Sequence, residues 1–314
     1  MRGAAAAAKR LESERARALF LGAAAHSVLP LERRSSAGFG TVLLALAHLV
    51  GWPFPRGGSQ ALADALAQRL RTLGGEIETG RRITSLDELP PARTVICDLT
   101  PRQLLALAGD ALPVRYRRRL RRWRYGPGVF KVDYALDGPI PWRAPEVAQA
   151  ATVHLGGTAQ EIADAERAPW QGRHADKPFV LLAQHTIFDD TRAPPGKHTV
   201  WAYCHVPHGS TVDVCDRVDA QIERFAPGFR DRIIACSTRT TEELERDNPN
   251  LVGGDISGGA TILRQVLARQ NHATPLPWLY LCSASTRPGA GVHGMCGHLA
   301  ARRALRRRYP PSEG

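Results

Sequence analysis

A glycine-rich segment near the end of the sequence constrains the fold most strongly. Residues 287–305 read RPGAGVHGMCGHLAARRAL, and Gly289, Gly291 and Gly294 have the GxGxxG spacing of loops that hold a dinucleotide pyrophosphate at a helix N-terminus. The apolar run WLYLCSAST before this loop predicts a strand, and MCGHLAARRAL after it predicts a helix. A complete dinucleotide-binding unit needs a second strand and an acidic residue about 20 positions further on. The sequence ends before both, so this loop is expected to complete a site built mainly from other segments.

Composition indicates a globular chain with one large domain or two smaller ones. Of 314 residues, 43% are hydrophobic and 23% are charged, which is the balance of folded proteins rather than disordered ones. The net charge is +12, and only 4 of the 42 basic residues are Lys. This arginine bias extends over the whole chain and favours a coding preference over a selected basic surface. Phosphates and nucleic acid stay among the candidate partners, because a basic surface attracts anions.

Membrane and metal sites are not expected. The longest apolar run, residues 42–52, is shorter than the ~18 residues of a membrane helix and contains His48. The N-terminus lacks the apolar region of a signal peptide, so a cytoplasmic protein without a membrane span is predicted. The six cysteines form no CxxC pair, which argues against zinc and iron–sulfur sites, and buried thiols are the simpler reading.

The first third of the chain predicts helices followed by a strand–helix unit. One helix is expected over residues 3–30, a mostly buried one over 36–50, and a third beginning at a Ser59 cap and ending before a strand at EIET (76–79). Gly57 and Gly58 precede the third helix, where backbone N–H groups can face a ligand. An ordinary tight turn is the alternative, and it is favoured if this motif is taken alone.

Residues 92–109 predict a short buried strand and then a helix, with Asp98 at their junction. Thr100 and Gln103 have the spacing of a capping box, and Pro101 occupies the first helical position. Junctions of this kind bind ligands in α/β proteins, because helix N-termini gather at the carboxyl ends of the strands. Asp98 is therefore a candidate site residue.

The middle of the chain predicts a basic helix and then a sheet. VRYRRRLRRWRYGPG (114–128) carries an apolar stripe among arginines, which favours an amphipathic surface helix over a nucleic-acid patch. VFKVDYAL alternates, and Lys131 and Asp133 on its polar face are expected to pair. Strand-like segments separated by Pro and Gly turns over 137–210 indicate an antiparallel or mixed sheet. A helix over 216–228, a strand at IIACSTR and a glycine-rich loop over 245–259 follow.

Four segments resemble one known family. SASTRPGAGVHGMCGHLAARRAL, GWPFPRGGSQALADAL, RYGPGVFKVDYALDGPIPW and NPNLVGGDISGG are similar to phytoene dehydrogenase-like and amine-oxidase-like FAD-dependent oxidoreductases. The resemblance is strongest to the branch that includes pyridine nucleotide-disulfide oxidoreductase domain-containing protein 2. The segments span most of residues 20–305 in the family's order.

The resemblance implies an α/β fold with mixed α+β character. An FAD-binding domain, formed by an N-terminal Rossmann unit and later returning segments, would carry an inserted substrate domain with helices and a mixed sheet. Here 1–91 would be the helical part of the substrate domain with the Gly57–Gly58 helix. Residues 92–112 would be a returning strand and helix, 113–255 the sheet of the substrate domain, and 256–314 the C-terminal FAD segment. The family's N-terminal fingerprint is absent, so an N-terminally truncated member is expected.

The resemblance also implies the cofactor and its contacts. FAD would be held largely through the backbone of Gly289, Ala290, Gly291, Val292, His293 and Gly294, together with Asp98, Gly57 and Gly58, and no metal is expected. Flavin would carry the chemistry, hydride transfer from a small apolar substrate, and no catalytic side chain is nominated. The alternative is a non-catalytic remnant or subunit whose partner, or second copy, supplies the Rossmann half. No specific nucleic-acid partner is expected.

Overall fold

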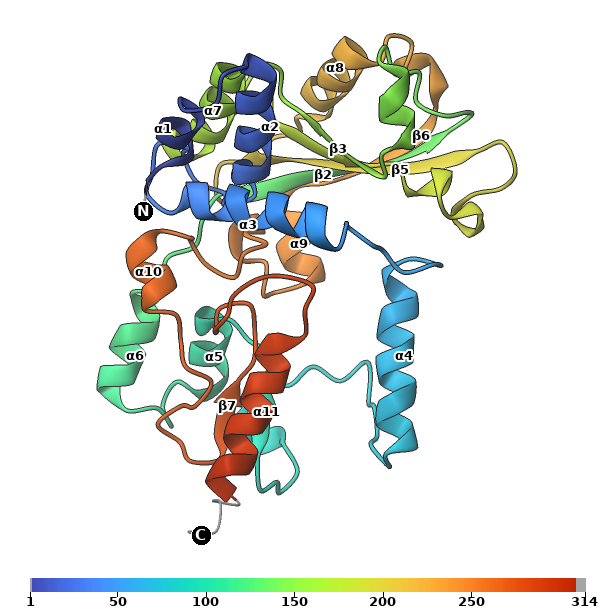
Figure 1. The fold of residues 1–314 in the computed structure, drawn as a ribbon. Helices are drawn as coiled ribbons and strands as arrows, with labels where there is room; N and C mark the ends of the chain where they lie inside the picture. The colour runs from blue at the N-terminus through green and yellow to red at the C-terminus, as the bar shows by residue number, and fades with distance from the viewer. Residues whose placement is uncertain (1, 309–314) are drawn as a thin grey trace.

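The computed structural model describes residues 2–308, and Figure 1 shows that they form two halves. One half contains a five-stranded sheet with helices on both sides. The other contains a two-stranded sheet surrounded by the last helix and several short ones. Short 3-10 turns connect the elements, at Leu86–Glu88, Pro145–Gln149, Pro169–Gln171, His185–Ile187, Asp190–Arg192, Arg230–Arg232 and Val252–Gly254.

The larger sheet has the order β3-β4-β5-β2-β6, and all its pairings are antiparallel. Its strands are β2 (Gly128–Leu136), β3 (Thr152–Leu155), β4 (Val180–Ala183), β5 (His198–Val206) and β6 (Ile233–Arg239). The antiparallel expectation is confirmed, and a mixed sheet is wrong for this part of the chain. The order includes two crossovers: the β2–β3 connection passes β5 and β4, and the connection that contains helix α8 (Cys215–Phe225) passes over β2 to join β5 to β6.

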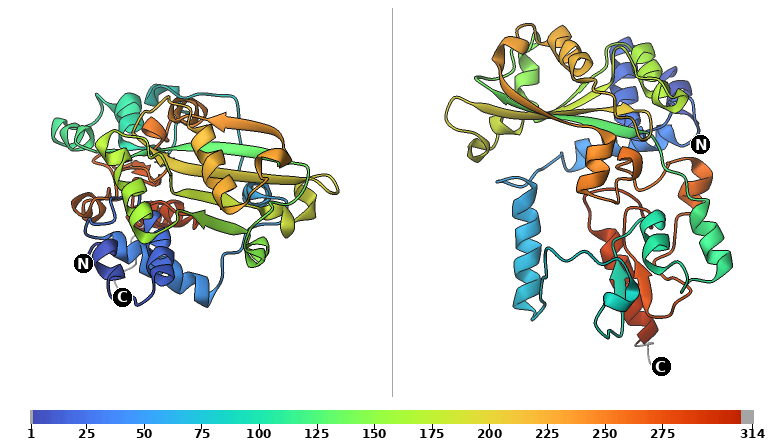
Figure 2. Two further views of the ribbon diagram at one scale, coloured as in Figure 1. Left: turned by 90° about the horizontal axis from the view of Figure 1, so that it is seen from above. Right: turned by 180° about the vertical axis from the view of Figure 1, so that it is seen from behind.

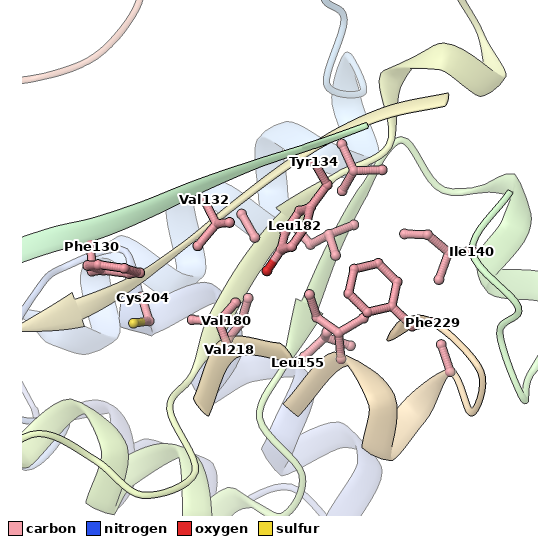
Figure 3. Packing of buried hydrophobic residues seen from close by; sticks show 14 of the residues in the cluster. Phe130, Val132, Tyr134, Ile140, Leu155, Val180, Leu182, Cys204, Val218 and Phe229 are labelled. Carbon is pink, nitrogen blue, oxygen red and sulfur yellow. The ribbon is translucent and has the colours of Figure 1, made fainter. Parts of the chain in front are cut away.

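The alternating pattern of β2 produces the main core. Phe130, Val132, Tyr134 and Leu136 point to one face and are almost fully buried. Helix α8 (Cys215–Phe225) covers this face, and Figure 3 shows Val218 with Leu182 and Phe229 in the cluster. The hydroxyl of Tyr134 donates to Asp219 Oδ1 at 2.6 Å, which satisfies a polar atom at the edge of the core.

Alanine-rich helices form a second core beside the sheet. The single helix expected over residues 3–30 is instead α1 (Ala4–Ala8) and α2 (Glu14–Ala25), which pack with α7 (Ala159–Arg167). The interruption has a local cause, because the hydroxyl of Ser13 accepts from the Ala16 N–H and starts a new helix. The small side chains allow close helix packing.

The smaller half is organised around two parallel strands, β1 (Val95–Cys97) and β7 (Leu279–Leu281). Its helices are α5 (Pro101–Ala108), α6 (Val114–Arg121), α10 (Leu263–Leu267) and α11 (Met295–Arg308), and α9 (Thr241–Asp247) lies toward the sheet half. The Leu281 N–H donates to His272 O at 2.7 Å, so the second edge of β7 is covered. Among residues 2–308 no strand pairs with the other edge of β1.

Two helices expose apolar faces. Helix α3 (Ser36–Leu49) buries only Ser36 and Gly40, so the expectation that it is mostly buried is wrong, and Leu49 is 77% exposed. Helix α4 (Ser59–Thr72) stands apart from both halves in Figures 1 and 2 and buries none of its residues. Leu66 on α4 is 66% exposed. The predicted strand at EIET does not form, since these residues have no strand partner in the described chain.

No helix within residues 2–308 is long and apolar enough to cross a membrane.

Candidate functional site

The glycine loop begins at the carboxyl edge of the β1–β7 sheet. Because the strands are parallel, Asp98 after β1 and Cys282 after β7 lie at the same edge. The Cys282 N–H donates to Cys97 O at 2.9 Å. Burial and the nearby carboxylate of Asp98 raise the pKa of Cys282 to about 12. The structure therefore brings Asp98 to the segment that leads into the loop, as the sequence pattern predicts.

The loop is exposed from Ala290 to Gly294, whereas Gly289 is buried, and its backbone needs glycine at three positions. Gly289 has φ 123°, Gly291 152° and Gly294 62°, conformations that side chains with a Cβ rarely adopt. Ala290 and His293 are exposed, and Val292 is 95% exposed, so the loop presents main chain and small side chains to its surroundings. His293 has a local role, since its Nδ1 accepts from the Met295 N–H at 3.0 Å and caps α11.

The first turn of α11 is bare. No heavy atom lies within 4 Å of the position that a Cβ on Gly294 or Gly297 would occupy. Helix α11 starts on the side facing α9 and the sheet and runs away from them (Figure 1). Its N-terminal N–H groups and the positive end of its dipole therefore face the region between the halves. Sequence reasoning missed Gly297, although its place one turn inside a helix is a signal for close approach to the backbone.

Residues 248–259 connect the two halves, and Asn250 holds one side. Its side-chain N–H donates to Asp98 O at 2.7 Å, and its Oδ1 accepts from the Thr100 N–H at 2.9 Å. Thr100 precedes α5 as expected, with Pro101 at the first position, but its side chain caps no backbone N–H, so the expected capping box is wrong. The Thr100 N–H instead donates to Asn250, which comes from a distant part of the chain.

Asp255 holds the other side of the same segment. Its carboxylate accepts from the Gly126 N–H and the Ser257 N–H, both at 2.7 Å. The residue is almost fully buried, and burial raises the pKa of its carboxyl, while the two backbone donors oppose that rise. Because Gly126 leads into β2, Asp255 ties the connecting segment to the sheet.

Gly258 and Arg269 carry the connection to the glycine loop. Gly258 O accepts from Ser285 Oγ at 2.6 Å, and a Cβ on Gly258 would lie 2.8 Å from Ala284 Cβ. The Arg269 guanidinium donates to Ala284 O and lies against Gly289, whose Cβ position is 3.1 Å from Arg269 Cζ. The start of the loop is thus positioned by backbone contacts and one arginine.

The sheet face opposite α8 carries polar and aromatic side chains. In the register of β2 against β5, Lys131 lies opposite Tyr203 and Asp133 lies opposite Trp201. Trp201 and Tyr203 stack with ring centroids 6.2 Å apart. Lys131 and Asp133 form the expected ion pair. In Figure 1, α3 and α9 lie on this side, with the smaller half beyond them. This face was not identified as a site from the sequence.

Two histidines are packed together beside the sheet. His26 Nε2 and His154 Nε2 are 3.0 Å apart, which requires one shared hydrogen. Burial, then the nearby His154 and His205, lower the pKa of His26 to about 3, and burial lowers that of His154 to about 4. His205 forms a separate buried pair with Glu166 at 2.9 Å. No group of three or more His, Cys, Asp and Glu side chains within residues 2–308 could hold a metal ion.

Gly57 and Gly58 lie in the turn before α4. The Gly57 N–H donates to Asp189 Oδ2 at 2.7 Å, and Arg192 Nη1 donates to Gly57 O at 2.6 Å. Gly58 itself is the helix cap, so the expected Ser59 cap is wrong. A neighbouring cavity of about 850 Å³ is lined by Trp52, Pro53, Phe54, Arg56, Ala151, Thr152, Thr186, Ile187, Phe188, Asp189 and Asp190. In the described residues no hydrogen bond joins this turn to the 289–294 loop, and its contacts agree with the tight-turn alternative.

No family model matches the chain. It is 28% identical over 84% of its length to pyridine nucleotide-disulfide oxidoreductase domain-containing protein 2 of Mus musculus, covering 54% of that protein. It is 25% identical to the lycopene-forming phytoene desaturase of Pantoea ananas, covering 84% of this chain and 58% of that one. The chain spans about half the length of the curated relatives it matches.

Solved structures show the same fold. An oxidoreductase from Methanosarcina mazei matches with a TM-score of 0.64 at 15% identity, over 96% of this chain and 68% of that one. Putrescine oxidase bound to putrescine matches with a TM-score of 0.58 at 14% identity, over 94% and 64%. The chain is a distant homologue of pyridine nucleotide-disulfide oxidoreductase domain-containing protein 2 and of phytoene desaturases, and it is related to FAD-dependent oxidoreductases.

Proposed function

We propose that the chain functions as an FAD-dependent oxidoreductase that transfers hydride from a small apolar organic substrate to the flavin. One observation carries the proposal. The parallel strands β1 and β7 end at the same edge in Asp98 and in a glycine loop that opens α11. The relationship to FAD-dependent oxidoreductases supports it.

The residues at this edge fit a flavin. Gly294 and the first turn at Gly297, where a Cβ would meet nothing within 4 Å, give space for a flat or anionic group to approach the main chain. The helix dipole of α11 favours negative charge there. Bound FAD would supply the acceptor for hydride, and Asp98 with the loop backbone would hold it.

The rest of the chain would orient the substrate and enclose the site. Trp201 and Tyr203 offer a flat surface to an apolar substrate on the sheet face. The connecting segment contacts three parts of the chain: Asn250 bonds Asp98 after β1, Asp255 bonds Gly126 before β2, and Gly258 bonds Ser285 before the loop. Lys131 and Asp133 satisfy each other, so we assign neither as an acid or a base. We assign Gly57 and Gly58 to the turn that enters α4.

A second candidate has its own observation. Proteins usually cover surfaces such as the exposed leucine face of α4 and the edge of β1 that no strand pairs with among residues 2–308. The alternative is therefore a non-catalytic remnant or subunit that needs a partner, either a chain carrying a Rossmann half or a second copy. In that case the flavin site would be complete only in the complex.

The test is flavin retention. The chain is incubated with excess FAD and desalted, and its visible spectrum is recorded, alone and with the N-terminal half of a relative added. Retention by the chain alone supports the first proposal, with Gly294→Val expected to abolish it. Retention only with the added half supports the second. A folded chain that retains no flavin in either case contradicts both.

A further inference from the structure

A groove of about 1240 Å³ lies between α6 and α10, and five arginines face it: Arg115, Arg118, Arg119, Arg122 and Arg264. All five are exposed. Within residues 2–308 none of them pairs with a carboxylate, and no acidic residue lines the groove. Their neighbour Arg117 differs, because it pairs with Asp110 at 2.9 Å.

Hydrogen bonds join the two walls of the groove. Gln265 Nε2 donates to Arg124 O at 2.8 Å and to Ala260 O at 2.9 Å, and Gln265 Oε1 accepts from the Arg124 N–H at 3.1 Å. Arg119 Nη2 donates to Ala268 O at 3.4 Å across the groove. These bonds join the end of α6 to α10, so the arginines do not depend on a ligand for their arrangement.

Charge and geometry point to a phosphate group. Arg115 and Arg119 are four residues apart on α6, as are Arg118 and Arg122, so like charges are neighbours on the helix and repel. An anion in the groove removes this repulsion. Guanidinium groups suit phosphate in particular, because their planar N–H donors bind two of its oxygens at once.

Exposed aliphatic side chains flank the arginines. Val114 at the start of α6 lines the groove and is 52% exposed, and Leu267 at the end of α10, next to the lining residue Ala268, is 65% exposed. Arginines beside exposed aliphatic residues are typical of surfaces that contact lipid headgroups and the first methylenes below them. We propose that the α6–α10 groove binds a phosphate group, and that Val114 and Leu267 favour the headgroup of an anionic phospholipid over free phosphate. This proposal does not depend on flavin binding.

The test uses two variants with the same change in net charge. The groove variant is Arg115→Gln/Arg118→Gln/Arg122→Gln, and its control on α11 is Arg303→Gln/Arg306→Gln/Arg307→Gln. Co-sedimentation is measured with phosphatidylcholine vesicles that contain phosphatidic acid, at physiological salt. We expect the full chain to bind, the groove variant to lose more than about tenfold in affinity, and the control to lose much less. Thermal unfolding checks that both variants fold.

A soluble arm separates the two sources of phosphate. Inorganic pyrophosphate is titrated into the same three proteins by calorimetry. Binding to pyrophosphate that depends on the groove arginines, without binding to vesicles, supports the groove and overturns the lipid headgroup. Equal losses in both triple variants, or no binding of either probe by the full chain, overturns the site, because only general positive charge would then be involved.

Discussion

The side-chain amide of Asn250 donates to the main-chain oxygen of Asp98 at 2.7 Å, although 152 positions separate them in the sequence. The same amide group accepts from the Thr100 N–H, which is buried. One side chain therefore holds the turn between β1 and α5 at the edge where the glycine loop begins. That edge is built jointly by three distant segments of the chain.

Asn250→Ala is expected to lower the free energy of unfolding by about 1–3 kcal/mol, because it leaves the buried Thr100 N–H without its acceptor. Urea denaturation measures the loss. Asn271→Ala is the control, since Asn271 is exposed and its side chain makes no hydrogen bond in the described structure. Equal effects of the two substitutions would show that the Asn250 bonds contribute nothing.

Gly258→Ala tests the contact between the connecting segment and the loop. Its Cβ would lie 2.8 Å from the carbonyl carbon of Ala284, whereas the same substitution at Gly209 meets nothing within 4 Å. Both glycines have positive φ, 64° and 71°, so both variants carry the left-handed cost of about 1–2 kcal/mol. We expect Gly258→Ala to be clearly less stable than Gly209→Ala in thermal unfolding. If the two variants melt together, the predicted close contact does not exist.

Gly297→Ala separates stability from cofactor binding. Alanine is the better helix former, so the variant is expected to gain about 0.5–1 kcal/mol. The added methyl group occupies the bare surface above the first turn of α11 and should weaken flavin retention. Gly38→Ala on α3 is matched, because its Cβ also meets nothing within 4 Å. Gly38→Ala should gain stability with flavin retention unchanged. Unchanged retention in both would remove Gly297 from the site.

The free energy of unfolding of the sheet half should decrease as the pH is lowered. The folded pKa values of His26 and His154 are about 3 and 4, below the unfolded value near 6.5. The unfolded chain therefore binds protons first as the pH falls, and the free energy of unfolding decreases from about pH 6.5 to 4. His154→Gln should reduce the difference between urea midpoints at pH 7 and pH 5. His48→Gln, at an exposed site on α3, should preserve it; a reduced difference in this control would refute the assignment.

The leucine face of α4 should tolerate polar residues. Leu66 and Leu73 are exposed, so Leu66→Gln/Leu73→Gln is expected to change the free energy of unfolding by less than about 1 kcal/mol. The comparison is Leu104→Ala in the core of the smaller half, which should cost about 2–5 kcal/mol. Light scattering should show less association for the α4 variant. A large loss of stability there would mean that α4 packs against its own chain.

Local signals in the sequence predicted many of the elements but not which surfaces pack on them. Alternation over VFKVDYAL predicted which side chains of β2 are buried, because a strand has only two faces. The strand, glycine loop and helix at the end of the chain were likewise predicted by local pattern. The burial of α3 was not, since an apolar helix indicates a preference for burial but not the presence of a surface to pack on.

The connecting segment shows why the site could be predicted only in part. Asp98 and the glycine loop follow from strand ends and glycine spacing. Asn250, Asp255 and Arg269 act through contacts with residues far away in the sequence, and no spacing rule links them. The Trp201–Tyr203 face depends on the register of β5 against β2, which a single sequence does not fix.

The segment around Gly258 has a consequence for how the protein tolerates change. Its carbonyl oxygen accepts from the short side chain of Ser285, and a Cβ here would lie 2.8 Å from both the Cβ and the carbonyl carbon of Ala284, so no long flexible side chain lies between the two segments. The approach of residue 258 to residues 284–285 therefore leaves no room for a side chain. A substitution whose neighbours are long side chains can be absorbed by new rotamers, but an added carbon here must move one of these two segments. Variants of this glycine would alter reach and alignment across the region before they altered any group that contacts a ligand.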